Sequence, residues 1–363
     1  RFLVPALTPI LLNVSLIASA LLLAGHLEVP VTALAWGVLA AGFAQLLIQV
    51  PALMRLGLMP RPRWGWRHSG VRRIIKLMIP TLFGSSVSQV NLLFYSIIAT
   101  FMVTGSVSWL YYSDRLLEFP LGVLGIALAT VILPNLSQKH AKASISEFSA
   151  TIDWALRLAV IITLPAAVGL IILSAPILIT LFQYDAFQLD DVRMSSYSLI
   201  AYAAGLPAFI AVKVLAPGYY ARQDTKTPVK IAIAAMVTNM GLNLVFVGLL
   251  LFQGFEGPHA GLALASSAAA YLNAGLLFRG LRKREVYTPE RGWLRVWIAV
   301  ILACSAMGAL LYFMTHDIES WHQATVYLRI KNLSLSIIFG VIIYIFTSMV
   351  MGLKTHDLSR GAK

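Results

Sequence analysis

The chain has 363 residues, of which 59% are hydrophobic and only 12% are charged. A soluble domain usually carries about 25% charged residues, so this composition excludes an ordinary soluble domain and predicts a protein that lies in lipid. The formal net charge of +13 would suggest a nucleic-acid partner in a soluble protein, but here the basic residues fall in short loops between apolar runs, so we expect no nucleic acid.

Apolar runs long enough to cross a bilayer recur along the whole chain. A spanning helix needs roughly 20 mostly apolar residues. We predict about ten such helices, at residues 3–25, 31–53, 77–103, 107–133, 154–175, 194–216, 229–251, 259–278, 293–314 and 332–352. The sequence therefore predicts an all-α polytopic membrane protein.

The loops between these spans alternate in charge. Basic loops precede the third span and follow the fourth, sixth, eighth and tenth, with residues such as Arg61, Lys139, Arg222, Arg282 and Lys354. By the positive-inside rule these loops are cytoplasmic, so both termini are predicted to be cytoplasmic too. The loop at 315–331 fits least well, because Arg329 and Lys331 offset the acids Asp317 and Glu319.

The basic segment 58–76 mixes arginine with Trp64 and Trp66 beside a span. This combination is typical of a cytoplasmic segment that lies at the membrane surface and contacts anionic headgroups. Two roles stay open for it: a plain topological anchor, or a part in admitting an anionic substrate.

Two stretches of sequence recur at similar positions. Residues 13–16 and 34–45, in the first two spans, resemble residues 239–242 and 262–273, in the seventh and eighth. Such a parallel repeat is common in transporters. It predicts that residues 1–57 are the last two helices of an N-terminally truncated lobe, with four helices upstream of Arg1. Residues 77–281 would form a six-helix C-terminal lobe, 292–352 two additional helices, and 353–363 a cytoplasmic tail.

The fourth span carries three charged residues, Asp114, Arg115 and Glu118. Each charge costs at least about 2.5–3.5 kcal/mol on insertion scales, so these residues are candidates for function. Arg115 and Glu118 are three apart and can pair, and Pro120 is expected to kink the helix beside them. One interpretation is a local ion pair that pins helices together. The other is a hydrated cavity in which Arg115 meets an anionic substrate and the acids tune it, with Ser108 on the same face.

Other chemistry-bearing residues are few. Lys213 is a second buried cation, near the cytoplasmic end of the sixth span, and is a further candidate. Cys304 lies in an apolar run and is expected to be a buried small side chain. The seven histidines lie in loops or at span ends, and none pairs with an acid at metal-ligand spacing. We therefore expect no metal site, no cofactor and no enzyme active site.

At the fourth span the sequence resembles a known family. Tyr111–Pro120 (YYSDRLLEFP) and the rest of 108–134 are similar to the eighth helix of the MurJ (MviN) lipid II flippases. The opening RFLVPA at 1–6 and the stretch APGYYARQDTKTP at 216–228 resemble the same family. The resemblance covers the whole chain.

The resemblance implies the two-lobe fold of the multidrug/oligosaccharidyl-lipid/polysaccharide exporters, with two extra helices that form a groove for a lipid tail. It implies movement of lipid II, the undecaprenyl-diphosphate-linked peptidoglycan precursor, from the inner to the outer leaflet of the bacterial inner membrane by alternating access. The energy source would be the membrane potential or an ion gradient. The family's cavity residues match Ser108, Asp114, Arg115, Glu118 and Lys213.

The implied partners are lipid II, membrane lipids and the cell-wall synthesis machinery. Two alternatives remain: a polysaccharide-unit or multidrug exporter of the same fold, and a non-transporting membrane scaffold of the cell-wall machinery. Arg115 favours an anionic substrate over a cationic drug.

Overall fold

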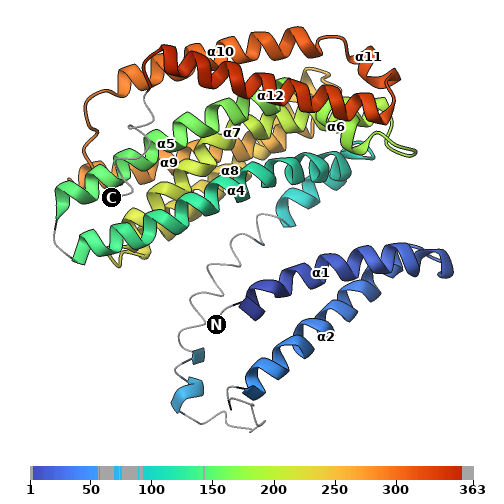
Figure 1. Ribbon diagram of the computed structural model, residues 1–363, viewed down its shortest axis with the longest axis horizontal. Coiled ribbons are helices and arrows are strands. Elements are labelled where there is room, and N and C mark those ends of the chain that lie inside the picture. The colour runs from blue at the N-terminus through green and yellow to red at the C-terminus, as the bar shows by residue number, and fades with distance from the viewer. Residues whose placement is uncertain are drawn as a thin grey trace. The chain divides into compact units, whose positions relative to one another are not determined.

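The computed structural model describes residues 3–55, 57, 69–72, 74–75, 89, 93–141 and 144–353. Every regular element in this part of the chain is a helix, so the all-α prediction is confirmed. The chain divides into two compact units, Arg1–Met78 and Ile79–Lys363 (Figure 1).

The first unit contains a helical hairpin. Its helices α1 (Leu3–Leu22) and α2 (Thr32–Arg55) are separated by a short 3-10 turn, η1 (Ala24–His26). The Ser15 hydroxyl donates a 2.7 Å hydrogen bond to the carbonyl of Gly37. A Cβ on Gly37 would lie only 2.2 Å from Ser19 Oγ. The hairpin is therefore held by small residues and side-chain hydrogen bonds, as is usual between helices in lipid.

The first continuous stretch described in the second unit is helical, at 93–100, after the single residue 89. Its helices are α4 (Ser106–Ala141), α5 (Ile145–Ile172), α6 (Ser174–Phe182), α7 (Leu189–Tyr220), α8 (Lys226–Phe252), α9 (Ala260–Lys283), α10 (Trp293–Thr315), α11 (Ile318–Gln323) and α12 (Val326–Val350).

Eight helices in the described part of the chain are long and apolar enough to cross a membrane: α1, α2, α5, α7, α8, α9, α10 and α12. They match eight of the ten predicted spans. The charged helix α4 covers the fourth predicted span. The third, at 77–103, lies mostly outside the described residues, as do most of the basic segment 58–76 and the tail after Leu353.

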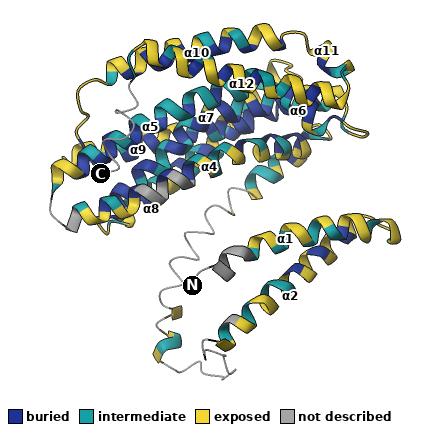
Figure 2. Ribbon diagram, in the orientation of Figure 1, coloured by how far each residue is buried: buried dark blue, intermediate teal, exposed yellow. Residues whose placement is uncertain are grey.

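Helix α7 lies at the centre of the second unit, in contact with α4, α5 and α9. Its side chains Leu206, Ile210 and Val214 are completely buried, and this core appears as dark blue along α7 in Figure 2. At Gly205 the backbone of α7 approaches α9 so closely that a Cβ would lie 2.8 Å from the Cα of Ser267. The absence of a side chain there permits the tight helix packing that membrane proteins use.

Helices α10 and α12 pack together along one side of this bundle, with α10 against α5 (Figure 1). The Tyr344 hydroxyl of α12 donates a 2.6 Å hydrogen bond to the carbonyl of Ile161 in α5. Cys304 and Met307 of α10 are buried in the cluster between these helices. The prediction that Cys304 is a small buried side chain is confirmed.

Several helices extend beyond the predicted spans, among them α4 at its C-terminal end and α5 and α12 at their N-terminal ends. Helix α5 begins at Ile145 rather than 154, because Phe148 and Ile152 are buried and extend the packed face. Helix α12 begins at Val326 rather than 332, so Arg329 and Lys331 lie in a helix and not in a loop. Helix α4 continues through Pro120, because a membrane helix tolerates a proline when its neighbours compensate for the missing hydrogen bond.

Candidate functional site

The predicted charged residues of α4 form a compact pair. Arg115 Nη1 lies 2.6 Å from Glu118 Oε2, and the two side chains are 54% and 53% exposed. The Arg115 guanidinium carbon also lies 4.9 Å from the centre of the Tyr111 ring. The pair forms within one helix at a spacing of three residues, which confirms the predicted pairing, and among the described residues it links no second helix.

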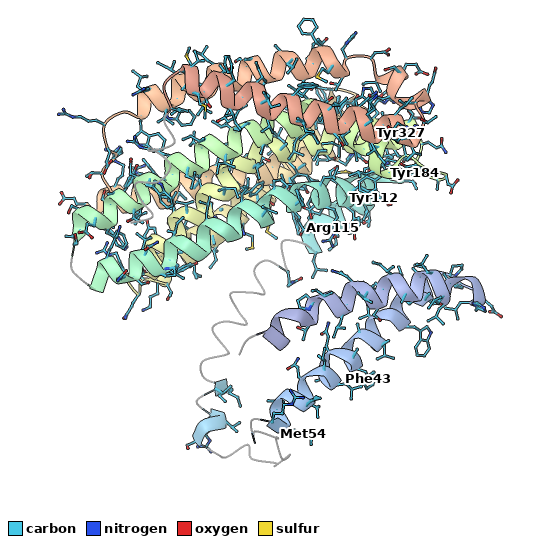
Figure 3. All side chains as sticks on the ribbon, viewed as in Figure 1. Phe43, Met54, Tyr112, Arg115, Tyr184 and Tyr327 are labelled. Atoms are coloured by element: carbon cyan, nitrogen blue, oxygen red, sulfur yellow. The ribbon has the colours of Figure 1, made fainter. Side chains whose placement is uncertain are left out.

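The exposed side of α4 carries a polar stripe. Ser108, Tyr111, Asp114, Arg115 and Glu118 are all exposed, and Figure 3 shows Arg115 on this side of the helix. Positions three, four and seven residues apart share a helix face, so Ser108, Tyr111, Arg115 and Glu118 follow one line. The structure thus brings four of the five predicted site residues onto one side of α4.

The opposite side of α4 is packed against α7. Leu110, Ser113 and Leu117 are buried there, and the Ser113 hydroxyl donates a 2.7 Å hydrogen bond to the carbonyl of Ser195. This buried side fixes the rotation of α4. The polar stripe therefore faces away from the interior of the second unit.

Lys213 is not part of the stripe. It lies on α7, where a Cβ on Gly125 of α4 would be 2.5 Å from its Cδ. Gly125 is ten residues beyond Arg115 (125 minus 115), which is about 15 Å along the helix. The structure places the two predicted cations at different levels of the α4–α7 contact.

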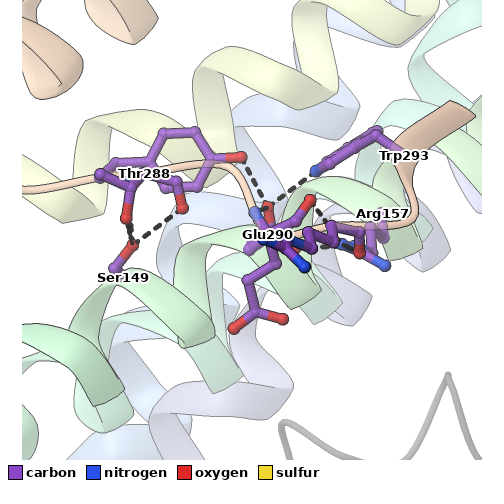
Figure 4. A network of polar contacts seen from close by, with 8 residues as sticks. Ser149, Arg157, Thr288, Glu290 and Trp293 are labelled. Carbon is purple, nitrogen blue, oxygen red and sulfur yellow. Dashed lines mark hydrogen bonds and ion pairs between the residues drawn. The ribbon is translucent and has the colours of Figure 1, made fainter.

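A buried polar network surrounds Asp153 (Figure 4), and it was not predicted from the sequence. The carboxylate of Asp153 is 1% exposed and receives a 2.7 Å bond from Arg157 Nε. It also accepts hydrogen bonds from the Tyr287 hydroxyl at 2.8 Å and the Trp293 indole at 2.8 Å. The only local signal was the spacing of four between Asp153 and Arg157, since the other partners are far away in the sequence.

A second buried charge, Arg329, ties three helices together. Its guanidinium donates to the carbonyls of Ile179 and Gln183 at 3.3 Å, His322 at 2.6 Å and Ala324 at 3.0 Å. These carbonyls lie at the C-terminal ends of α6 and α11, where helices leave carbonyls unpaired and a cation is favourable. Arg329 is therefore a structural residue of the fold and is not available to a substrate.

An open apolar groove of about 400 Å³ runs between α5 and α10. Leu164 and Val168 line it from α5, and Cys304, Ser305 and Gly308 are among its residues from α10. Its lining is mostly apolar and its mouth is open, which is the form expected of a site for a hydrocarbon chain. Among the described residues, no group of three or more His, Cys, Asp or Glu side chains is placed to hold a metal ion.

Comparison with known proteins identifies similar chains. Residues 1–350 match the sequence model of the family described as lipid II flippase MurJ. The chain is 46% identical over 365 residues to the probable lipid II flippase MurJ of Haemophilus influenzae, an alignment that covers 99% of this chain and 70% of that protein. It is 40% identical over 367 residues to the lipid II flippase MurJ of Burkholderia cenocepacia, covering 100% of this chain and 70% of that protein.

A solved structure has the same fold. The lipid II flippase MurJ in its inward closed conformation superposes with a TM-score of 0.72, over 95% of this chain and 67% of that chain. The sequence identity in this comparison is 24%, so the likeness concerns the fold alone.

Proposed function

The chain belongs to the MurJ family of lipid II flippases, and we propose that it moves lipid II from the inner to the outer leaflet of the bacterial inner membrane. It is a membrane transporter and not an enzyme. Contact with the cell-wall synthesis machinery is part of the same proposal and rests on the family resemblance.

The observation that carries the proposal is the exposed Arg115 on the polar stripe of α4. A diphosphate needs a cation, and an arginine can bind a phosphate group through two parallel hydrogen bonds. In the structure Arg115 is held by Glu118 and Tyr111 and is still about half exposed. A diphosphate can therefore reach its guanidinium without unfolding any packed part of the helix.

The two carboxylates of the stripe limit how tightly an anion is bound. Asp114 and Glu118 flank Arg115 on the same helix, and Glu118 already occupies one side of the guanidinium. An incoming diphosphate competes with Glu118 for Arg115, so the substrate is bound and also released. Release is a requirement for transport, because a site that holds its ligand too firmly does not turn over.

The polyprenyl tail of the substrate is proposed to lie in the apolar groove between α5 and α10. The polyprenyl chain is apolar, and removing each of its CH₂ groups from water is worth about 0.8 kcal/mol. With the tail along Val168 and Gly308, it stays in an apolar environment while the headgroup crosses. Outward movement of the anionic headgroup is favoured by an inside-negative potential, by about 2.3 kcal/mol per charge for 100 mV.

The test is the substitution Arg115→Ala in the full-length gene. The variant is expressed in a strain from which all other lipid II flippase activity has been depleted, so that growth depends on the variant. We expect loss of growth and accumulation of lipid II in the inner leaflet, because the fixed cation of the stripe is lost. Arg115→Lys keeps the charge but not the bidentate geometry, and should rescue only in part. Arg291→Ala removes an exposed arginine elsewhere in the same unit and serves as the control.

Normal growth with a well-expressed Arg115→Ala protein would contradict the proposal. So would the same growth defect in the Arg291→Ala control, since that result would indicate a general sensitivity to lost positive charge. The amount of protein in the membrane is measured for each variant, so that failure to insert is distinguished from failure to transport.

A further inference from the structure

A basic pocket lies at the opposite end of α4 from the polar stripe. It has a volume of about 260 Å³ and is lined by Lys139 near the end of α4, Arg222 after α7, and Arg284 after α9. The carboxylate of Glu285 is the one acidic group among the described residues that line it. The pocket therefore has an excess of positive charge.

The three cations differ in how far they are already occupied. Lys139 Nζ donates to the Thr151 hydroxyl at 2.8 Å, which holds its amine in place and leaves further protons for a ligand. Arg284 is bonded to Asp224 and to the Thr227 hydroxyl. The guanidinium of Arg222 is exposed and makes no ion pair or hydrogen bond with the described residues. Arg222 is thus the cation most available to an anion.

The pocket also includes the start of α5. Ser144 and Ile145 line it, and the side chain of Ser144, the N-cap residue, makes no capping hydrogen bond. The first N–H groups of a helix have no partner within the helix and carry partial positive charge, which favours an anion. This contribution adds to the charge of Lys139 and Arg222 and comes from a different part of the chain.

The walls of the pocket are amphipathic. Phe148 and Val286 are buried and form an apolar floor, while Ile145 is an exposed apolar side chain on the rim. The charge of its loops predicts that this end of the unit faces the cytoplasm, at the membrane surface. Basic pockets between membrane helices on that side bind the headgroups of acidic lipids.

From these features we infer that the pocket binds the phosphate headgroup of an anionic membrane phospholipid, with the acyl chains beside Ile145. The site is separate from the polar stripe, because Lys139 lies 24 residues beyond Arg115 on α4 (139 minus 115), or about 36 Å along the helix. It is therefore a lipid site in addition to the one proposed for the transported substrate.

Native mass spectrometry of the purified protein in mixed micelles tests this inference. The probes are phosphatidylglycerol, which is anionic, and phosphatidylethanolamine, which is zwitterionic. We expect the unmodified protein to retain phosphatidylglycerol preferentially. In Arg222→Glu the affinity for phosphatidylglycerol should decrease by at least about tenfold, because one charge-assisted contact is lost and a repelling carboxylate is added. Arg222→Gln, which adds no carboxylate, should show a smaller decrease in the same direction.

Lys283→Glu is the matched control, because it makes the same change in charge at an exposed residue of α9 that does not line the pocket. It should retain phosphatidylglycerol, as should Arg115→Ala, even where that variant fails to transport. Equal losses in Arg222→Glu and Lys283→Glu would overturn the inference, as would equal retention of the two phospholipids. Displacement of phosphatidylglycerol by millimolar inorganic phosphate would overturn the assignment to a lipid headgroup.

Discussion

The Trp293 indole donates a 2.8 Å hydrogen bond to the carboxylate of Asp153, although 140 residues separate the two in the chain. Trp293 is the first residue of α10, and Asp153 lies in the third turn of α5. The Tyr287 hydroxyl donates to the same oxygen, and its burial, followed by this hydrogen bond, raises the pKa of Tyr287. The tyrosine therefore remains a donor at physiological pH, and the connection between α9 and α10 is fixed onto α5.

The substitution Asp153→Ala should strongly destabilise the protein. It leaves Tyr287 and Trp293 without their acceptor and Arg157 without its ion-pair partner, and breaking a buried charge pair typically costs about 3–5 kcal/mol. Thermal unfolding in detergent should show a clear decrease in Tm. Glu147→Ala, at an exposed position in the first turn of α5, should cost about 0.5 kcal/mol. Equal effects of the two substitutions would contradict a role for the network.

Replacement of Arg329 by glutamine should loosen the ends of α6 and α11. Arg329 is 8% exposed, and its hydrogen bonds to four carbonyls would be lost in large part. We expect a loss of about 2–4 kcal/mol in unfolding free energy, because bonds to a charged donor are lost and buried carbonyls lose their partner. Hydrogen exchange should become faster at residues 179–188 and 318–325.

Lys331→Gln provides the control for Arg329. Lys331 is exposed one half-turn further along α12, so its replacement should leave both unfolding and hydrogen exchange unchanged. Unchanged exchange in Arg329→Gln would show that the carbonyl contacts do not hold these helix ends.

The sequence predicted the features that depend on local spacing. The apolar runs located the spans, and the three-residue spacing of Arg115 and Glu118 predicted their ion pair, which the structure has at 2.6 Å. The position of Lys213 depends instead on how α7 packs against Gly125 of α4. No periodicity within one helix contains that information.

The buried charges were missed for a related reason. Arg329 was predicted to lie in a loop. Its acceptors at His322 and Ala324 belong to that same stretch, but the carbonyls of Ile179 and Gln183 are 150 and 146 residues away in the sequence. The fifth predicted span begins at residue 154, so it excludes Asp153. Only the tertiary structure shows that distant donors, Tyr287 and Trp293, make its burial favourable.

Filling the groove between α5 and α10 should impair transport without affecting the anion site. Ser305→Trp places a large side chain where the polyprenyl tail is proposed to lie. We expect slower flipping, because the indole fills the space that the polyprenyl tail is proposed to occupy. Leu302→Trp, on the same helix but outside the groove, is the control. Normal flipping by Ser305→Trp in proteoliposomes would exclude this groove as the tail site.

The ion pair between Asp224 and Arg284 should give the stability of the protein a defined dependence on pH. Hydrogen bonds from Thr227, followed by that from Arg284, lower the pKa of Asp224 to about 2. Because the pKa is lower in the folded state, the stabilisation is fully present above the unfolded value near 4 and is lost as the pH falls toward about 2. The pair is partly exposed, so its contribution is at most about 1 kcal/mol and decreases with salt.

The stability of Asp224→Asn, measured by thermal unfolding, should therefore be lower than that of the unmodified protein. The deficit should be constant above about pH 5 and should shrink between about pH 4 and 2. The deficit shrinks at low pH because the unmodified protein loses its ion pair when Asp224 is protonated, whereas asparagine lacks the ion pair at every pH. Asp185→Asn removes an exposed carboxylate that makes no hydrogen bond or ion pair with the described residues, and should show no such dependence. A difference for Asp224→Asn that stays constant down to about pH 2 would mean that the carboxylate is not held as the structure shows.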